Sequence, residues 1–190
     1  YGNIWLGLQN GMIIKWDKKT GAFLSPGKEW NKVLKKQAPV TDIYIDNNRS
    51  CWVTSMDGFH EFDLQKRIYV QTWLPGKNNP AAISGSVCNG IEAYNDSIML
   101  ISTLYGGLNF FNKRTKSFTH LDASDGFPSN SIYAIKKDIA GNIWITNDYG
   151  IYQYKPAEKK VIPFGIEPGI INSSFSANRF YPLQNGQWLS

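Results

Sequence analysis

One short phrase recurs along this chain. It reads GNIWLG at 2–7, GNIWIT at 141–146 and NGQWLS at 185–190. Aligned on the tryptophan, five anchor residues are spaced 44–48 positions apart, namely Trp5, Trp52, Leu100, Trp144 and Trp188. A glycine stands six residues after each of the first four anchors, at Gly11, Gly58, Gly106 and Gly150. Self-similarity at a period of roughly 20–50 residues indicates an architecture built from repeats.

Each unit divides into four short predicted strands. In the unit around Trp144 they are 131–138, 142–146, 150–155 and 160–164. Turn signals containing Gly, Asn, Asp or Pro separate these segments, and the first alternates between apolar and polar residues. No helical periodicity competes with this pattern. Four antiparallel strands in 44–48 residues describe a propeller blade, whereas the repeats of a stacked β-solenoid are usually shorter.

The predicted fold class is therefore all-β, a β-propeller of four-stranded antiparallel blades with about four blades in this chain. The predicted boundaries of the units are 1–37, 38–85, 86–129, 130–173 and, for the start of a further blade, 174–190. Both ends of the chain read as second strands, which gives 17 strands where a closed four-bladed ring needs 16. We therefore expect an open arc, or one part of a larger propeller, with unpaired strand edges and apolar faces at both ends.

Such an arc is expected to associate with itself or with the missing blades. The repeated tryptophans Trp5, Trp52 and Trp144 lie in the middle of strands, and we expect them to pack between neighbouring blades. The 14% aromatic residues and 17 glycines agree with β structure and many turns. No apolar run approaches the roughly 20 residues of a membrane-spanning helix, so the segment is expected to be soluble. It starts inside a strand without Met or signal peptide, which predicts a piece of a larger protein.

The sequence offers few candidates for catalysis or metal binding. Cys51 and Cys88 lie in apolar runs and are expected to be core residues. The sequence leaves open whether the two form a disulfide in an oxidising compartment. His60 and His120 have no nucleophile or metal-spaced partner nearby in the sequence, and both are expected to be structural. Convergent carboxylates from Asp42, Glu92 and Asp138 are not excluded. We predict no catalytic residues, no metal site and no cofactor.

The net charge of +5 and the pI near 9.1 raise the question of nucleic-acid binding. The lysines gather in turns, however, where solvated lysines protect exposed strand edges. The lysines predicted to lie in turns are Lys18, Lys19, Lys113, Lys116, Lys136, Lys137, Lys159 and Lys160. We predict no nucleic-acid partner, and an anionic ligand such as an acidic glycan stays open.

The sequence gives a clearer prediction for a ligand-binding site than for a catalytic site. If the first strand of each unit is innermost, the second-to-third turns and the long connections between units open on one face, called the loop face below. Amide and carboxylate groups beside exposed aromatic rings suit sugars, whose hydroxyls need hydrogen bonds and whose C–H faces pack on rings. The candidate ligand-binding residues on this face are Asn10, Trp30, Asp57, Tyr105, Phe127, Asn147, Asp148 and Tyr149.

Residues 125–155, DGFPSNSIYAIKKDIAGNIWITNDYGIYQYK, resemble the two-component regulator propeller repeat. In that family a Gly-Leu-Pro-Ser-Asn lead-in precedes an apolar strand, an acidic turn, Gly-Asn-Ile-Trp, Gly-Leu and an aromatic-Asp ending. Here Phe127 replaces the leucine of the lead-in. The resemblance extends over the chain unevenly, because Leu100 replaces the tryptophan and 48–50 lack Gly-Asn. The tail 172–190 is similar to the family's final blade.

The resemblance implies a larger, seven-bladed type of propeller in the periplasmic sensor part of a hybrid two-component histidine kinase. It implies an oligosaccharide or other small solute as the partner, and a membrane-anchored, homodimeric parent. The segment itself would then be a non-enzymatic sensor. Two other interpretations stay open. One is a propeller enzyme, such as a polysaccharide lyase, a glycosidase or a quinone-dependent dehydrogenase. The other is a protein-docking propeller, because a fold alone does not imply a function.

Overall fold

The computed structural model confirms the all-β fold. It describes residues 3–25, 30, 38–46 and 49–164, together with the backbone of two short strands near the C-terminus. The first sheet contains the three strands β1 (Asn3–Gly7), β2 (Ile13–Asp17) and β3 (Phe23–Leu24). A single turn of 3-10 helix, η1 (Ala123–Asp125), interrupts the strands. Within the described residues, no helix is long and apolar enough to cross a bilayer.

Three complete four-stranded antiparallel sheets follow in sequence order. The second sheet is built from β4 (Val40–Asp46), β5 (Ser50–Ser55), β6 (Gly58–Asp63) and β7 (Ile68–Trp73). The third is built from β8 (Cys88–Ala93), β9 (Ile98–Thr103), β10 (Gly107–Asn112) and β11 (Ser117–Leu121). The fourth is built from β12 (Ile132–Lys137), β13 (Ile143–Asn147), β14 (Gly150–Lys155) and β15 (Lys160–Phe164). We call these four sheets blades A to D.

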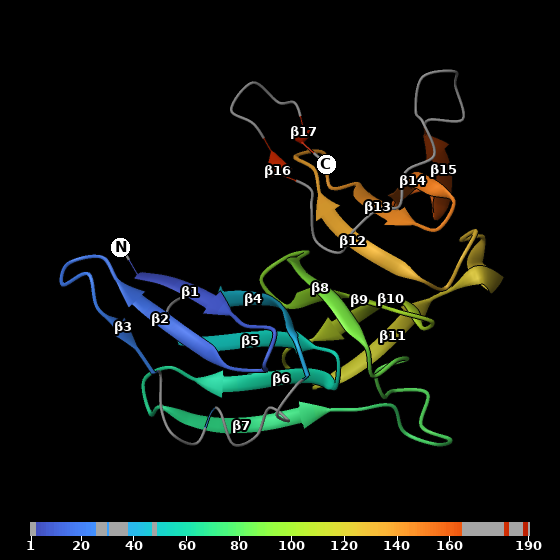
Figure 1. Ribbon diagram of the computed structural model, residues 1–190. Coiled ribbons are helices and arrows are strands. Elements are labelled where there is room, and N and C mark those ends of the chain that lie inside the picture. Colours follow the sequence, from blue (N-terminus) through green and yellow to red (C-terminus); the bar gives the residue numbers. More distant parts are fainter. Residues whose placement is uncertain are drawn as a thin grey trace.

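The blades lie side by side in sequence order and form an arc (Figure 1). The first strands of blades B, C and D are innermost, because β4 contacts β8 and β8 contacts β12. A last pair, β16 (Tyr181–Pro182) with β17 (Trp188–Leu189), forms its own two-stranded sheet. Among the described strands, β1 pairs only with β2, so no sheet closes the arc into a ring. The expected open arc, with three strands at one end and two at the other, is confirmed.

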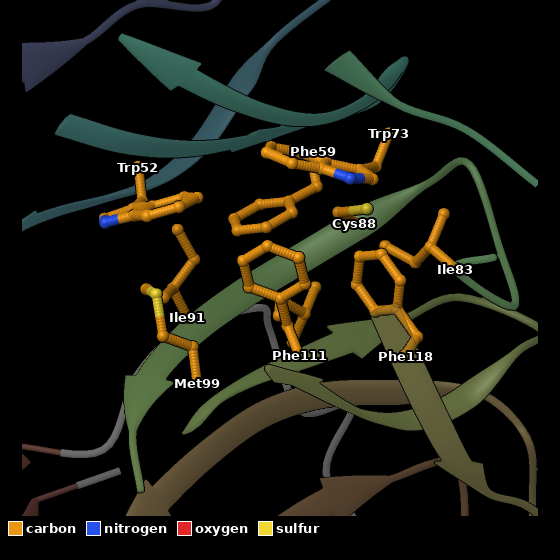
Figure 2. Close-up of a cluster of buried hydrophobic side chains, with 10 residues drawn as sticks. Trp52, Phe59, Trp73, Ile83, Cys88, Ile91, Met99, Phe111 and Phe118 are labelled. Atoms are coloured by element: carbon orange, nitrogen blue, oxygen red, sulfur yellow. The ribbon is translucent and has the colours of Figure 1, made fainter. Parts of the chain in front are cut away.

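Apolar clusters fill the space between successive blades. Side chains alternate across each strand, so that Cys51 and Val53 face blade A while Trp52 between them faces blade C. Between blades B and C, the Trp52 ring lies 5.4 Å from Phe59 and 5.5 Å from Phe111, measured between ring centroids (Figure 2). The anchor position of the repeat therefore packs against the following blade, as predicted.

The anchors are not equally buried. Trp52 is buried, and Leu100 is buried in the cluster between blades C and D. Trp5 and Trp144 are half-buried. Trp144 belongs to blade D at one end of the arc, whereas Trp5 packs on Trp30 in the cluster between blades A and B. Both cysteines are free and buried in different clusters, Cys51 between A and B and Cys88 between B and C. Burial raises the pKa of both thiols.

Several lysines differ from the prediction of freely solvated turn residues. Lys113 Nζ lies 2.8 Å from Asp46 Oδ2, Lys116 Nζ 2.9 Å from Glu61 Oε2, and Lys136 Nζ 2.7 Å from Glu92 Oε2. Each pair joins a lysine of one blade to a carboxylate of the blade before it. Lys113 and Lys116 lie in the turn between β10 and β11, whereas Lys136 lies in strand β12 and not in a turn as predicted, and all three side chains stabilise contacts between blades.

Candidate functional site

The loop face carries one cluster of polar and aromatic side chains, between blades C and D. Asp148 stands in the turn between β13 and β14 and is exposed. Its Oδ2 atom accepts a hydrogen bond from Ser129 Oγ at 3.2 Å, and its Oδ1 atom accepts one from the Tyr133 hydroxyl. The carboxylate is thus held by the connection before blade D and by the innermost strand β12. We call Tyr105, Ser129, Tyr133, Asp148 and Tyr149 the tyrosine site.

A β-bulge places Tyr133 in this site. The pairing of β12 with β13 shifts between Ile132 and Ala134, so Tyr133 has no partner of its own across the strands. A bulge turns the extra side chain out of the regular alternation. The hydrogen bond to Asp148, aided by partial burial and by the charges of Asp148 and Tyr105, raises the pKa of Tyr133 to about 12. Tyr133 therefore remains a neutral donor at physiological pH.

Two exposed phenol rings stand in the neighbouring turns, Tyr149 next to Asp148 in blade D and Tyr105 in the turn between β9 and β10 of blade C. Tyr149 is 70% exposed, and its backbone N–H donates to Asn147 Oδ1 at 2.8 Å, which fixes the turn. Tyr105 is 75% exposed and adopts a φ of 72°. Bulky residues other than glycine rarely adopt this left-handed conformation, and strained residues of this kind cluster at functional sites. The turn of blade C thus presents a large aromatic side chain to solvent at a conformational cost.

Other candidates from the sequence serve the fold. Trp30 is fully buried, and its ring centroid lies 4.5 Å from that of Phe62 and 5.7 Å from that of Trp5. Phe127 is 3% exposed and packs on Tyr154 at 5.7 Å. The expectation that these two loop rings face solvent is wrong. Connections between blades cross apolar clusters, and burying a large ring there is more favourable than exposing it.

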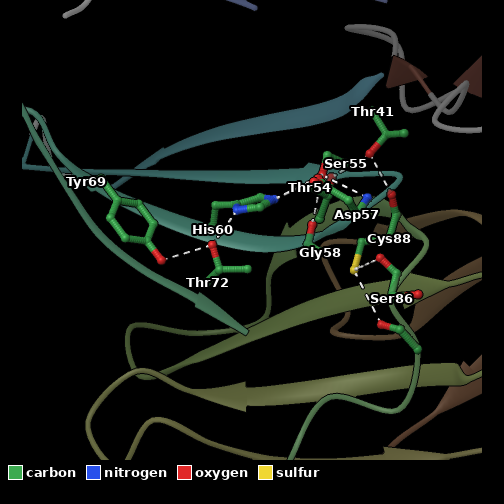
Figure 3. Close-up of polar contacts among 11 residues, drawn as sticks. Thr41, Thr54, Ser55, Asp57, Gly58, His60, Tyr69, Thr72, Ser86 and Cys88 are labelled. Carbon is green, nitrogen blue, oxygen red and sulfur yellow. Dashed lines mark hydrogen bonds and ion pairs between the residues drawn. The ribbon is translucent and has the colours of Figure 1, made fainter. Parts of the chain in front are cut away.

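Asp57 belongs to a buried network instead of an open site (Figure 3). Its Oδ1 atom accepts from Ser55 Oγ at 2.5 Å and lies 3.4 Å from His60 Nε2. His60 Nε2 is 2.9 Å from Ser55 Oγ and His60 Nδ1 is 2.8 Å from Thr72 Oγ1, so the ring joins the second, third and fourth strands of blade B. Burial lowers the pKa of His60 to about 4, and Asp57 opposes that shift. The neutral histidine is structural.

The two remaining candidates shape turns. Asn10 Oδ1 accepts from Met12 N at 3.1 Å in the turn of blade A. Asn147 is fully buried below the tyrosine site, and its Nδ2 atom has no hydrogen-bond partner among the described residues. Of the eight candidates, Asp148 and Tyr149 share one turn with the buried Asn147, and Tyr105 lies close enough to Tyr133 to affect its pKa.

Sequence reasoning missed Ser129 and Tyr133 as members of the site. Ser129 is part of the Pro-Ser-Asn lead-in that precedes the first strand, so the motif already placed it next to the loop face. Tyr133 read as an ordinary strand residue, and no local signal marks the bulge that redirects it. The described residues contain no group of three or more His, Cys, Asp or Glu side chains arranged to bind a metal ion.

Comparison with solved structures places the chain among β-propellers. It superposes on the extracellular domain of BT4673 from B. thetaiotaomicron, described as a hybrid two component system. The TM-score is 0.74 at 17% identity, covering 98% of this chain and 26% of that one. The corresponding domain of BT3049 from B. thetaiotaomicron gives a TM-score of 0.73 at 19% identity, covering 98% and 24%. The chain thus spans about a quarter of these extracellular domains.

The WD40 β-propeller domain of Doa1 also matches, with a TM-score of 0.67 at 14% identity, covering 99% of this chain and 56% of that one. No curated protein sequence matches the chain. The family model of the two-component regulator propeller matches residues 126–149, which include Ser129, Tyr133, Asp148 and Tyr149. The chain therefore carries a two-component regulator propeller repeat, and four of the five residues of the tyrosine site lie within it.

Proposed function

We propose that this chain is the ligand-sensing propeller segment of an extracytoplasmic two-component sensor, and that the tyrosine site recognises an oligosaccharide. The observation that carries the proposal is the exposed Asp148 carboxylate, held by Tyr133 and Ser129, with the exposed Tyr149 beside it in the same turn. An ionised carboxylate offers about four acceptor positions, so two remain for the hydroxyls of a sugar. Exposed phenols supply apolar faces for the C–H groups of a pyranose ring.

The distribution of charge favours an uncharged glycan at this face. Among the described residues, the second-to-third turns and the connections between blades contain four carboxylates and one cation, namely Asp57, Asp122, Asp125, Asp148 and Lys77. The third-to-fourth turns, at the opposite ends of the strands, carry Lys18, Lys19, Lys66, Arg67, Lys113, Arg114, Lys116, Lys159 and Glu158. Among the described residues, the basic groups of the turns thus lie mainly at the opposite ends of the strands, and the carboxylates of the loop face disfavour an anionic ligand at the site.

Signalling to a histidine kinase across a membrane is the output that the similarity to two-component extracellular domains supports. Ligand binding between blades C and D would join the turns of two blades, because Tyr105 belongs to one and Asp148 to the other. A ligand held by both would change the free energy of the contact between the blades. A sensor domain can transmit ligand binding through such a change, because the ligand favours one arrangement of the two blades over another.

A titration of neutral and acidic oligosaccharides by calorimetry tests the proposal. We expect neutral oligosaccharides to bind and uronic or sulfated ones to bind at least tenfold more weakly. Tyr149→Ala should weaken binding by about tenfold, because a stacked ring contributes roughly 1–1.5 kcal/mol. Ile139→Ala is the matched control, since Ile139 is fully exposed at the opposite ends of the strands. Unchanged affinity in Tyr149→Ala, or an equal loss in both variants, would remove the tyrosine site from recognition.

A further inference from the structure

The first-to-second and third-to-fourth turns of the blades lie at the ends of the strands opposite the loop face, and we call this end of the arc the turn face. In blade B it is the end where β6 stops and β7 begins (Figure 1). Most of the exposed charged side chains that the structure describes in or next to these turns are cations. They are Lys18, Lys19, Arg49, Lys66, Arg67, Arg114, Lys116, Lys159 and Lys160, against the carboxylates of Asp96 and Glu158. Such a surface attracts an anionic partner.

Less exposed carboxylates of the turn face are used by the fold. Asp17 Oδ1 accepts a hydrogen bond from Lys19 N at 2.8 Å, and Asp63 Oδ1 accepts one from Lys66 N at 2.8 Å, so both side chains fix their own turns. Apart from Lys116, none of the exposed cations of the turn face forms an ion pair within the described residues. Their charges are therefore available to a partner.

A strained backbone position recurs in the third-to-fourth turns. The fifth residue of each turn has a left-handed φ, which is 69° at Gly21, 59° at Arg67, 57° at Lys116 and 50° at Lys159. Glycine adopts this conformation freely, whereas a long side chain adopts it at a cost in conformational free energy. Lys116 covers Trp52 and so serves the packing. The side chains of Arg67 and Lys159 make no ion pair or hydrogen bond with any residue that the structure describes, so the fold itself does not require their charge.

An aliphatic side chain projects from the same end of blade D. Ile139 lies in the turn between β12 and β13 and is fully exposed. Asp138 fixes this turn, because its N–H donates to the Asn142 carbonyl and its Oδ1 atom accepts from Asn142 N at 2.9 Å. The position five residues before the anchor is asparagine in the two preceding units, at Asn47 and Asn95, as turn chemistry favours. The turn itself therefore does not call for isoleucine, and its side chain is free to contact a partner.

We propose that the turn face docks on a bilayer surface that contains anionic phospholipids. The exposed cations lie beside the lipid phosphates, and Ile139 enters the apolar layer below the headgroups. Attraction to anionic headgroups and burial of apolar area act together in this kind of surface binding. The loop face lies at the other ends of the strands, so the tyrosine site stays open to solutes while the chain is docked.

A bilayer fits this surface better than a nucleic acid or a sulfated polysaccharide does. Both polyanions would pair with the cations, but neither has an apolar layer in which to bury Ile139. Proteins bind single-stranded nucleic acids with aromatic rings that stack on the bases, and the described residues of these turns present no exposed ring. The isoleucine therefore decides between the partners.

Co-sedimentation of the full chain with lipid vesicles tests the proposal. The probe is a vesicle of equimolar phosphatidylglycerol and phosphatidylcholine, and a vesicle of phosphatidylcholine alone is the reference. We expect at least tenfold tighter binding to the anionic vesicle, because each basic side chain near an anionic surface contributes about fivefold. Added salt should weaken this binding, since it screens exposed charges.

Two pairs of variants separate the contributions of the apolar and the charged groups. Ile139→Ala should weaken binding to the anionic vesicle by about tenfold, because it removes apolar carbons from the bilayer. Its control is Met56→Ala, which shortens an exposed aliphatic side chain on the loop face and should change nothing. Lys159→Gln should weaken binding roughly fivefold, whereas Lys77→Gln removes the same charge from the loop face and should have little effect.

Amide hydrogen exchange on the vesicles identifies the docked surface. We expect slower exchange in 138–142 and no change in the turn at 148–149. Absence of binding, equal binding to both vesicles, or protection on the loop face would overturn the proposal. Full binding by Ile139→Ala, together with equally tight binding of the chain to heparin or duplex DNA, would show a general polyanion site instead of a membrane surface. Because the two sites lie at opposite ends of the strands, loss of lipid binding in Ile139→Ala with unchanged oligosaccharide affinity would support the proposal independently of the proposed function.

Discussion

Lys116 lies over the indole ring of Trp52, with its Nζ atom 4.8 Å from the ring centroid, although the two residues belong to adjacent blades. The same ammonium group is 2.9 Å from Glu61 Oε2. A turn lysine of blade C therefore covers the edge of the aromatic cluster in blade B. The contact combines a cation–π interaction with an ion pair between residues 55 positions apart.

Lys116→Ala should destabilise the chain by about 1 kcal/mol. The ammonium is partly exposed, so solvent screens the ion pair and the cation–π contact supplies most of the effect. Urea denaturation of the wild type, Lys116→Ala, Glu61→Gln and the double variant measures the coupling. Lys66→Ala, in the equivalent turn of blade B, removes the same charge and should change the stability much less. Equal losses in both lysine variants would assign the effect to net charge alone.

Trp52→Ala should lower the free energy of unfolding by about 3–5 kcal/mol, because it leaves a cavity in the cluster between blades B and C. Trp52→Phe should cost much less, since the indole N–H has no hydrogen-bond partner among the described residues. Trp144→Ala should cost less than Trp52→Ala, because Trp144 is only half-buried. Thermal unfolding compares the three variants. A native melting temperature in Trp52→Ala would contradict the structural role of the repeated tryptophan.

The buried His60 should make stability fall between pH 6.5 and about 4. Burial holds the pKa of His60 near 4 in the folded chain, whereas the unfolded chain binds the proton near 6.5. The unfolded state thus binds more protons in this window, and stability that is complete above pH 6.5 declines as the pH falls, by on the order of 3 kcal/mol. His60→Asn should remove this part of the pH dependence, measured by urea unfolding at several pH values.

Asparagine suits this test because Asn109 occupies the equivalent position in blade C. There its Oδ1 atom accepts hydrogen bonds from the backbone and hydroxyl of Ser84. The variant therefore keeps a polar group able to bond its neighbours without titrating. Parallel stability curves for the wild type and His60→Asn across the window would show that another group is responsible.

Asp148→Asn should lower the pKa of Tyr133 from about 12 towards its ordinary value near 10, because the amide accepts a weaker hydrogen bond and carries no charge. Carbon-13 NMR of the tyrosine ring, assigned with Tyr133→Phe, follows the titration. The fold should be unaffected, since both side chains lie at the surface. A pKa of Tyr133 that stays near 12 would show that Asp148 does not hold this phenol.

The repeat alone predicted the blades, their order and the open arc. Strand alternation and turn chemistry are local, so the four strands of blade D agree with the predicted segments to within about one residue. The turn between the second and third strands likewise placed Asp148 and Tyr149 together on the loop face.

The tertiary structure decided which loop rings are buried, which lysines form ion pairs and how the residues of the site are arranged. Trp30 and Phe127 are buried, Lys113 and Lys116 form ion pairs, and the bulge at Tyr133 brings a hydroxyl to Asp148. The burial and the ion pairs join residues that the chain brings together only when one blade packs on the next, whereas the contact between Tyr133 and Asp148 forms within blade D through a bulge that no local signal marks. A periodic sequence determines the unit that repeats, because that unit depends on neighbours a few residues away. Burial, ion pairing and the geometry of the site depend on the free energy of packing between units, which only the tertiary structure decides.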